Sequence, residues 1–314
     1  MELHRPERGA LRAIVVPLDG SPFALQALPV ALGLAARSHA ALHLVHVQSP
    51  PVPLVDFPGA PTVDVALAAQ RAAVTEATLQ ELAGRIRARW KLEVSVAIRL
   101  GWTGETIAAY AREAGADMIV LATHGRGGVS RFWLGSVADE LLRIANVPVL
   151  AVRPARRGPG LGRERRFRHL LAPLDGTDLA EQALAPAIVT ARLWKARLTL
   201  LRVITPHLAI ARPAPVTRLD RADLARQRQQ AEGYLHGVAD RLRREGVSVT
   251  TRVVANADPA RAIIRAATAG RMDLIAIASH ARGGLGRLLR GSVCDKVLRG
   301  ATGAAILLTR PGGA

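Results

Sequence analysis

The chain has 314 residues, enough for roughly two domains of about 150 residues each. Its formal net charge is +18, and 49% of its residues are hydrophobic. The single cysteine, Cys294, excludes an internal disulfide framework and a cysteine-built zinc site, and it favours a reducing, cytoplasmic location. We expect no membrane span and no secretory signal, because no apolar run approaches the ~20 residues of a spanning helix and none follows Met1.

The positive charge is uneven along the chain. Residues 1–157 contain 17 Lys and Arg against 13 Asp and Glu, whereas residues 158–314 contain 26 against 12. Such an excess attracts nucleic acid or another polyanion. We favour the simpler interpretation, arginines spread over solvated helix faces, because no aromatic residues interleave with them as a single-strand binder requires. Nucleic acid is therefore not an expected partner, although the basic second half leaves it open.

The first half alternates short apolar segments with segments of helical composition. Short apolar runs between turns are typical of buried parallel strands. Strands are predicted at 13–17, 41–47, 92–99, 117–122 and 148–152. Helices are predicted between them at 24–38, 65–90, 105–114 and 136–145, and the Pro-rich segment 50–65 is predicted to be a surface loop.

The second half repeats the first at a constant spacing of 156 residues. Pro17-Leu-Asp-Gly-Ser21 returns as Pro173-Leu-Asp-Gly-Thr177, and Thr123-His-Gly-Arg-Gly-Gly128 returns as Ser279-His-Ala-Arg-Gly-Gly284. This spacing is about three times the longest usual solenoid repeat, so each copy is a whole domain. The predicted domains are 1–154 and 167–314, joined by an exposed Gly-, Pro- and Arg-rich linker at 155–166.

The elements of the second copy follow the same order. Its strands are predicted at 170–173, 198–204, 247–254, 273–278 and 305–308. Its helices are predicted at 179–195, 220–245, 260–269 and 292–300. The fold class is therefore α/β, with two tandem doubly wound domains, each a five-stranded, mostly parallel sheet flanked by helices in a Rossmann-like arrangement. Ligands bind such sheets at the carboxyl ends of the strands, where the residues common to both copies lie.

The glycine-rich loop after the fourth strand is the best candidate for binding chemistry. Its glycines let the backbone approach phosphate closely, and Gly135-Ser136 then opens a helix whose free amides and dipole suit an anion. Ser136-x-x-Asp139 and Ser292-x-x-Asp295 also resemble capping boxes, in which the serine merely caps its helix. From the residues alone the two interpretations weigh equally. No Walker A or Gly-x-Gly-x-x-Gly motif follows the first strand.

With these motifs the chain resembles the universal stress protein family in its tandem form, which implies a fold like that of the adenine nucleotide alpha hydrolases. The pattern Gly-x2-Gly-x9-Gly-Ser/Thr of the family's nucleotide-binding members falls on Ala122, Gly125, Gly135 and Ser136. In the second copy it falls on Ala278, Ala281, Gly291 and Ser292. The strand-one aspartates, Asp19 and Asp175, and the strand-two valines, Val47 and Val203, match as well.

This resemblance implies ATP as the ligand, with or without Mg, acting as a switch or sensor in stress response. Pro17, Asp19 and Val47 would hold the adenosine, and the phosphates would lie against Gly125 and the start of the following helix. Because Ala281 puts a Cβ where phosphate must approach, we expect tighter binding by the first copy. The candidate cofactor-binding residues are Pro17, Asp19, Val47, Ala122, Gly125, Arg126, Gly135, Ser136, Val137, Pro173, Asp175, Val203, Ala278, Arg282, Gly291, Ser292 and Val293.

Several residues near these motifs can also have purely structural roles. Asp19 could simply form a turn, and His124 and His280 fit turn residues better than general bases. Cys294 stands where the first copy has Ala138, which indicates a small packing residue. No catalytic residue or metal ligand is predicted, so we expect at most slow ATP hydrolysis.

Two expectations concern partners. By the resemblance, the last strands pair within the chain as an internal pseudo-dimer, and a homodimer is a further expectation. The rival hypothesis is an interaction module of the same fold that binds no nucleotide and uses its basic surface on a protein or nucleic acid.

Overall fold

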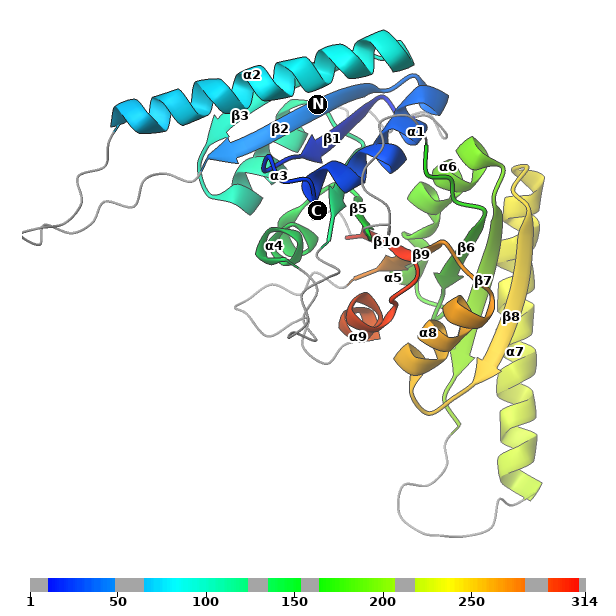
Figure 1. The fold of residues 1–314 in the computed structure, drawn as a ribbon. Coiled ribbons are helices and arrows are strands. Elements are labelled where there is room, and N and C mark those ends of the chain that lie inside the picture. Colours follow the sequence, from blue (N-terminus) through cyan, green and yellow to red (C-terminus); the bar gives the residue numbers. More distant parts are fainter. Residues whose placement is uncertain are drawn as a thin grey trace, which may run out of the picture. The chain divides into compact units, whose positions relative to one another are not determined.

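The computed structural model describes residues 11–48, 65–123, 135–153, 164–206, 218–279 and 293–310. The chain divides into two compact units, the first ending at Arg165 and the second continuing from Arg166 to the C-terminus. Each unit is a parallel sheet with helices on both faces, so the predicted fold class is confirmed (Figure 1). No described helix is long and apolar enough to span a bilayer.

The sheet of the first unit has the order β3-β2-β1-β4-β5, and its strands pair in parallel. Its strands are β1 Ala13–Pro17, β2 Ala41–Gln48, β3 Val94–Leu100, β4 Met118–Ala122 and β5 Val149–Val152. Its helices are η1 Ala24–Ala27, α1 Leu28–Ser38, α2 Val65–Trp90, α3 Thr103–Glu113 and α4 Ser136–Ile144. The chain winds outward in both directions from β1 and β4, so α1 and α2 cover one face and α3 and α4 the other (Figure 1).

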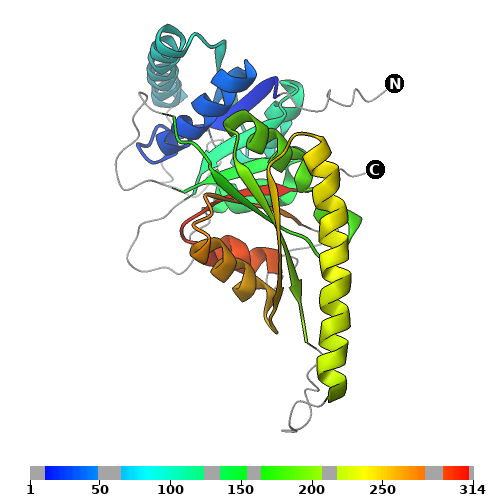
Figure 2. The same cartoon turned by 90° about the vertical axis from the view of Figure 1, so that its right-hand side faces the viewer.

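The second unit repeats this winding, with the strand order β8-β7-β6-β9-β10. Its strands are β6 His169–Pro173, β7 Arg197–Ile204, β8 Val249–Ala255, β9 Leu274–Ala278 and β10 Ala305–Thr309. Its helices are α5 Asp178–Glu181, α6 Leu184–Trp194, α7 Arg218–Arg244, α8 Pro259–Ala269 and α9 Val293–Gly300. The long α7 lies on one face of this sheet and α8 with α9 on the other (Figure 2).

Each unit has two short helices after its first strand, where the sequence predicts a single helix. In the first unit η1 gives way to α1 near Pro29, and in the second α5 ends before α6, which contains Pro186. Proline has no amide hydrogen to donate and its ring crowds the preceding turn. Each proline therefore lies in the first turn of a new helix, where an amide donor is not required.

Small aliphatic side chains fill both interiors. Ile14, Val15 and Val16 of β1 have no exposed surface, and neither do Ile119 and Val120 of β4. Strands buried on both faces need apolar residues at successive positions, which is why these segments show no alternation.

A repeated aspartate fixes the start of the central strand in each unit. Asp117 Oδ2 accepts the backbone N–H groups of Arg12 and Ala13 at 2.6 and 3.2 Å. Asp273 Oδ2 accepts those of Arg168 and His169 at 2.7 and 3.0 Å. Both carboxylates satisfy amides that would otherwise be unpaired at the edge of the sheet opposite the candidate site.

The end of the predicted linker is bound to the first unit. Glu164 forms a two-contact ion pair with Arg37, at 3.1 and 2.7 Å. The backbone N–H of Arg165 donates to the carbonyl of Pro29 at 2.9 Å. These contacts explain why the compact first unit extends to Arg165.

Candidate functional site

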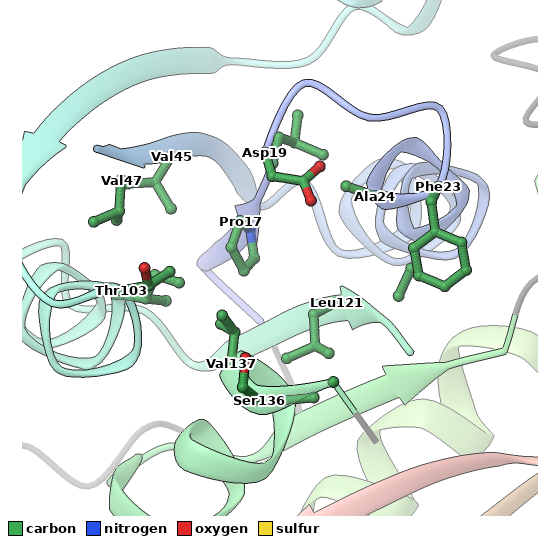
Figure 3. A pocket seen from close by; sticks show the side chains of 15 residues that line it. Pro17, Asp19, Phe23, Ala24, Val45, Val47, Thr103, Leu121, Ser136 and Val137 are labelled. Atoms are coloured by element: carbon green, nitrogen blue, oxygen red, sulfur yellow. The ribbon is translucent and has the colours of Figure 1, made fainter. Parts of the chain in front are cut away.

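A cavity of about 140 Å³ opens at the carboxyl ends of β1, β2 and β4 in the first unit (Figure 3). This is where the strand order reverses, between β1 and β4. Seven predicted residues line it: Pro17, Asp19, Val47, Ala122, Gly135, Ser136 and Val137. The predicted Gly125 and Arg126 lie outside the described residues. Residues from four separate segments of sequence thus meet at one site.

The walls of the cavity are mainly apolar. Val45 and Val47 line one side and Leu121 and Val137 another, with Pro17 between them (Figure 3). Aliphatic surfaces of this kind suit the faces of a planar, uncharged ring system. Polar atoms come from few residues, so they can fix the orientation of a ligand.

Asp19 stands at the mouth and also forms the turn after β1. Its Oδ1 accepts the backbone N–H of Ser21 at 2.9 Å, and Asp175 in the second unit repeats the contact with Thr177 at 3.0 Å. Asp19 therefore forms the turn after β1, which is one of the two roles that the sequence allowed it. No hydrogen bond to the second carboxylate oxygen of Asp19 is found among the described residues, so that oxygen can accept one from a ligand.

The start of α4 faces the cavity with open backbone amides. The N-cap residue is Gly135, with extended backbone at φ −63° and ψ 155°, and no side chain among the described residues caps the helix. The capping-box interpretation is therefore wrong for Ser136, which is the first helical residue and exposes its hydroxyl at the cavity. The first amides of α4, together with the positive end of its dipole, are available to an anion.

A second helix start opens onto the same cavity and was missed from the sequence. Helix α3 begins at Thr103, which lines the cavity, and no side chain caps it. In the second unit the matching helix α8 has Asp258 as its N-cap, accepting the N–H of Arg261 at 3.2 Å, and Pro259 in the place of Thr103. Residues that are the same in both copies cannot reveal Thr103, because the second copy has Pro259 at the matching position.

The turn after β1 is held by a second contact that differs between the units. His46 Nδ1 lies 2.8 Å from the carbonyl oxygen of Leu18. The backbone N–H of Leu18 in turn donates to the carbonyl oxygen of Val45 at 2.8 Å. In the second unit Arg202 replaces His46 and its guanidinium donates to the carbonyl of Leu174 at 3.4 Å. Both side chains serve the backbone of the turn, in keeping with a structural role for His46.

The second-unit candidates occupy matching places where they are described. Pro173 ends β6 and pairs with Leu201 of β7, as Pro17 pairs with Val45. Asp175 follows β6, Val203 lies on β7, Ala278 ends β9 and Val293 begins α9. The predicted Arg282, Gly291 and Ser292, like His124 and His280, fall outside the described residues.

The lone cysteine lies at the start of α9, in the place of the cavity-lining Ala138. Cys294 is 6% exposed, and burial raises the pKa of its thiol to about 12. A thiol of this kind is a poor nucleophile, as a packing role requires. Among the described residues, no three His, Cys, Asp or Glu side chains are grouped as a metal site would need.

Comparison with known proteins gives one consistent family. The sequence pattern of the Universal stress protein family matches twice, at residues 10–153 and 166–307. A universal stress protein of Mycobacterium tuberculosis is 31% identical over 191 residues, and the match covers 59% of this chain and 59% of the relative. One from Mycolicibacterium smegmatis is 28% identical over 306 residues, covering 95% of this chain and 97% of the relative.

The fold is also shared with solved structures. A universal stress protein from Archaeoglobus fulgidus superposes with a TM-score of 0.69 at 18% identity, over 96% of both chains. A protein of Pseudomonas aeruginosa, described as functionally unknown, superposes with a TM-score of 0.65 at 21% identity. At these identities the likeness establishes the α/β fold and the two-unit organisation.

Proposed function

The chain belongs to the universal stress protein family in its tandem, two-domain form, and on that premise we propose that its first unit binds ATP. The nucleotide would act as a switch or sensor ligand in stress response, with its occupancy favouring one conformation or partner surface. One observation carries the proposal most directly: the uncapped start of α4 lies on an apolar cavity at the reversal of strand order.

Different parts of the cavity match the base, the ribose and the phosphates of ATP. Aliphatic walls from Val45, Val47 and Leu121 favour the base, while the second oxygen of Asp19 can accept a ribose hydroxyl. The phosphates would lie toward the amides of α4 and the hydroxyl of Ser136. Gly125 joins this proposal through the family pattern, and Arg126 through the positive charge that it adds next to Gly125 in the sequence.

Other parts of the proposal rest on chemistry and family membership. Mg would be held mainly by phosphate and water, because Asp19 is the only acidic residue lining the described cavity. No side chain there is identified as a nucleophile with its base, so ATP hydrolysis would be slow at most. A cytoplasmic location and pairing through the last strands, or as a homodimer, remain family-based proposals; light scattering after size exclusion tests the homodimer.

Calorimetric titration of the full chain with ATP and Mg tests the central claim. We expect saturable binding that Ser136→Trp abolishes by filling the cavity. Ser292→Trp, the same change at the matching position of the second copy, is the control and should leave the main binding event intact. Absence of binding by the wild-type chain at millimolar ATP, or equal loss in both variants, would overturn the proposal.

A further inference from the structure

One face of the second unit carries a group of exposed basic residues that the first unit lacks. We propose that this face, built by β8, α8 and α9, binds the phosphate backbone of double-stranded nucleic acid without regard to base sequence. The basic face is defined by Arg252, Arg261, Arg265, Arg271 and Lys296, all of them exposed. It shares no residue with the cavity of the first unit, so it stands independently of ATP binding.

The charge of this face is reversed relative to the first unit. In the second unit, β8, α8 and α9 carry five basic residues and one acidic one, a balance of +4. This count includes Arg299, which pairs with Asp295 and is not part of the basic face, and it leaves out Arg271, which follows α8. The matching β3, α3 and α4 carry three basic and four acidic residues, a balance of −1. The difference of five charges is half of the ten by which the two halves of the chain differ. An even spread of arginine over the surface would not give this concentration.

Individual positions make the reversal plain. Arg261 and Lys296 stand where the first unit has Glu105 and Glu140, at the spacing of 156 residues. Glu140 and Gly104 lie against each other in the first unit, since a Cβ on Gly104 would overlap the side chain of Glu140. The matching positions in the second unit are Lys296 of α9 and Ala260 of α8, two helices that pack on each other.

The basic face keeps its charges free for a partner. None of its five residues forms an ion pair among the described parts of the chain. On α7, at the opposite face of the sheet, four arginines are each paired with a carboxylate: Arg226, Arg228, Arg241 and Arg243. Four of the seven arginines of α7 are thus offset by a carboxylate within the described parts of the chain, whereas none of the five residues of the basic face is.

The geometry gathers these side chains on one surface. Arg261 and Arg265 are one turn apart on α8, roughly 6 Å between Cβ atoms. Helix α9 packs directly on α8, because Gly300 faces Ile264 with no room for a side chain, and the two helices lie side by side in Figure 2.

Arg252 reaches the same face from the edge strand β8. Side chains two apart on a strand share a face, so Arg252 lies with Thr250, which contacts Thr199 at 3.0 Å. In the first unit the matching Ser95 contacts His43, and His43 contacts Tyr110 of α3. The face of Thr250 is therefore the face covered by α8.

The composition of the face selects the kind of polyanion. β8, α8 and α9 contain no aromatic residue, so they cannot offer the stacking platforms on which single-stranded bases bind. A duplex instead presents about one phosphate charge per ~1.7 Å of axis with its bases shielded. Arginine contacts to this backbone position a protein but read no sequence.

Fluorescence anisotropy of the full chain with a short labelled duplex of arbitrary sequence tests the proposal across a salt series. If about five phosphates are contacted, the logarithm of the affinity should fall with the logarithm of the salt concentration at a slope of about −4.5. Arg261→Gln with Arg265→Gln should weaken binding and reduce the slope by about two. Arg226→Gln with Arg228→Gln removes the same charge from α7 and should change neither.

Lys296→Glu restores the residue of the first unit and provides a second variant at an exposed position. It should weaken duplex binding more than Lys296→Gln, with circular dichroism unchanged. Three results would overturn the proposal: no duplex binding at low salt, equal losses in the α7 control, or binding to anionic vesicles or an acidic peptide without binding to the duplex. Loss of ATP binding in Ser136→Trp with duplex binding retained would separate the two proposals.

Discussion

Single residues at matching positions show how two copies of one fold can diverge. His46 and Arg202 both hold the carbonyl that follows the first strand, although one is an imidazole and the other a guanidinium. Asp19 and Asp175 keep the same turn contact in both units. The backbone of the turn is thus preserved while the side chains beneath it change.

His43 supplies a pH-dependent contribution to the stability of the first unit. Its Nδ1 lies 2.8 Å from Ser95 Oγ, and its ring meets Tyr110 edge-on with 6.1 Å between centroids. Burial lowers the pKa of His43 and outweighs Glu93, which raises it. The folded state therefore holds this proton less tightly than the unfolded chain. The stability that depends on neutral His43 is complete above about pH 6.5 and is lost as the pH falls toward the lower folded-state pKa.

His43→Thr, which installs the residue found at Thr199, removes this titration. As the pH is lowered from about 8 to about 5, the melting temperature of the wild-type chain should fall further than that of the variant. Other titrating groups are common to both proteins and cancel in the difference. A difference that does not change with pH would show that His43 titrates alike in the folded and unfolded chains.

The thiol of Cys294 should react with a thiol reagent far more slowly in the folded chain than in the unfolded chain. Burial raises its pKa to about 12, so little thiolate exists near neutral pH. We expect modification by a thiol reagent at about pH 8 to be at least 100-fold slower in the native chain than in urea, roughly the scale set by a shift of several pKa units. Rapid labelling of the native chain would contradict the packing role.

At the scale of elements, the starts of α3 and α8 differ in a way that predicts opposite responses to mutation. Helix α8 is capped by Asp258, whereas α3 has Trp102 at its N-cap without a side-chain hydrogen bond. An aspartate at this position accepts an orphan amide and complements the helix dipole. A helix start that is left open next to a cavity keeps its donors for another group.

Exchanging the caps tests this difference. Asp258→Ala should lower the free energy of unfolding of the second unit by about 0.5–2 kcal/mol. Trp102→Asp should raise that of the first unit by roughly 0.5–1 kcal/mol and weaken ATP binding, because it adds a negative charge near the cavity and occupies an amide at the start of α3. Urea unfolding and calorimetry measure the two effects. Stabilisation without any loss of ATP affinity would indicate that α3 takes no part in the site.

For the whole molecule, the differences between the units predict one strong nucleotide site in each chain. The second copy has Ala281 where the first has Gly125, and its α8 start is already capped and begins with Pro259. Calorimetry should therefore give a stoichiometry near one ATP per chain, with any second event much weaker. Two equivalent sites would mean that the second copy tolerates both changes.

The sequence by itself determined the order and approximate bounds of the elements and the duplication of the fold. These follow from local chemistry: apolar runs must be buried, prolines and glycines interrupt them, and a repeat at 156 residues leaves few alternatives. The family resemblance also predicted that Asp19, Val47 and Ser136 belong to one site, and all three line the same cavity. The predicted helices missed only details such as the break before α6, where Pro186 competes with an otherwise continuous pattern.

Only the tertiary structure decided what those residues face. Ser136 could have been a cap or a ligand contact, and Thr103 had no signal at all because its counterpart is Pro259. Likewise, the net charge gave no hint that arginines without ion pairs among the described residues lie on α8 while four of the seven on α7 are paired. Hydrogen bonding and electrostatic attraction depend on distance in space, and folding brings together segments that lie many residues apart in the chain.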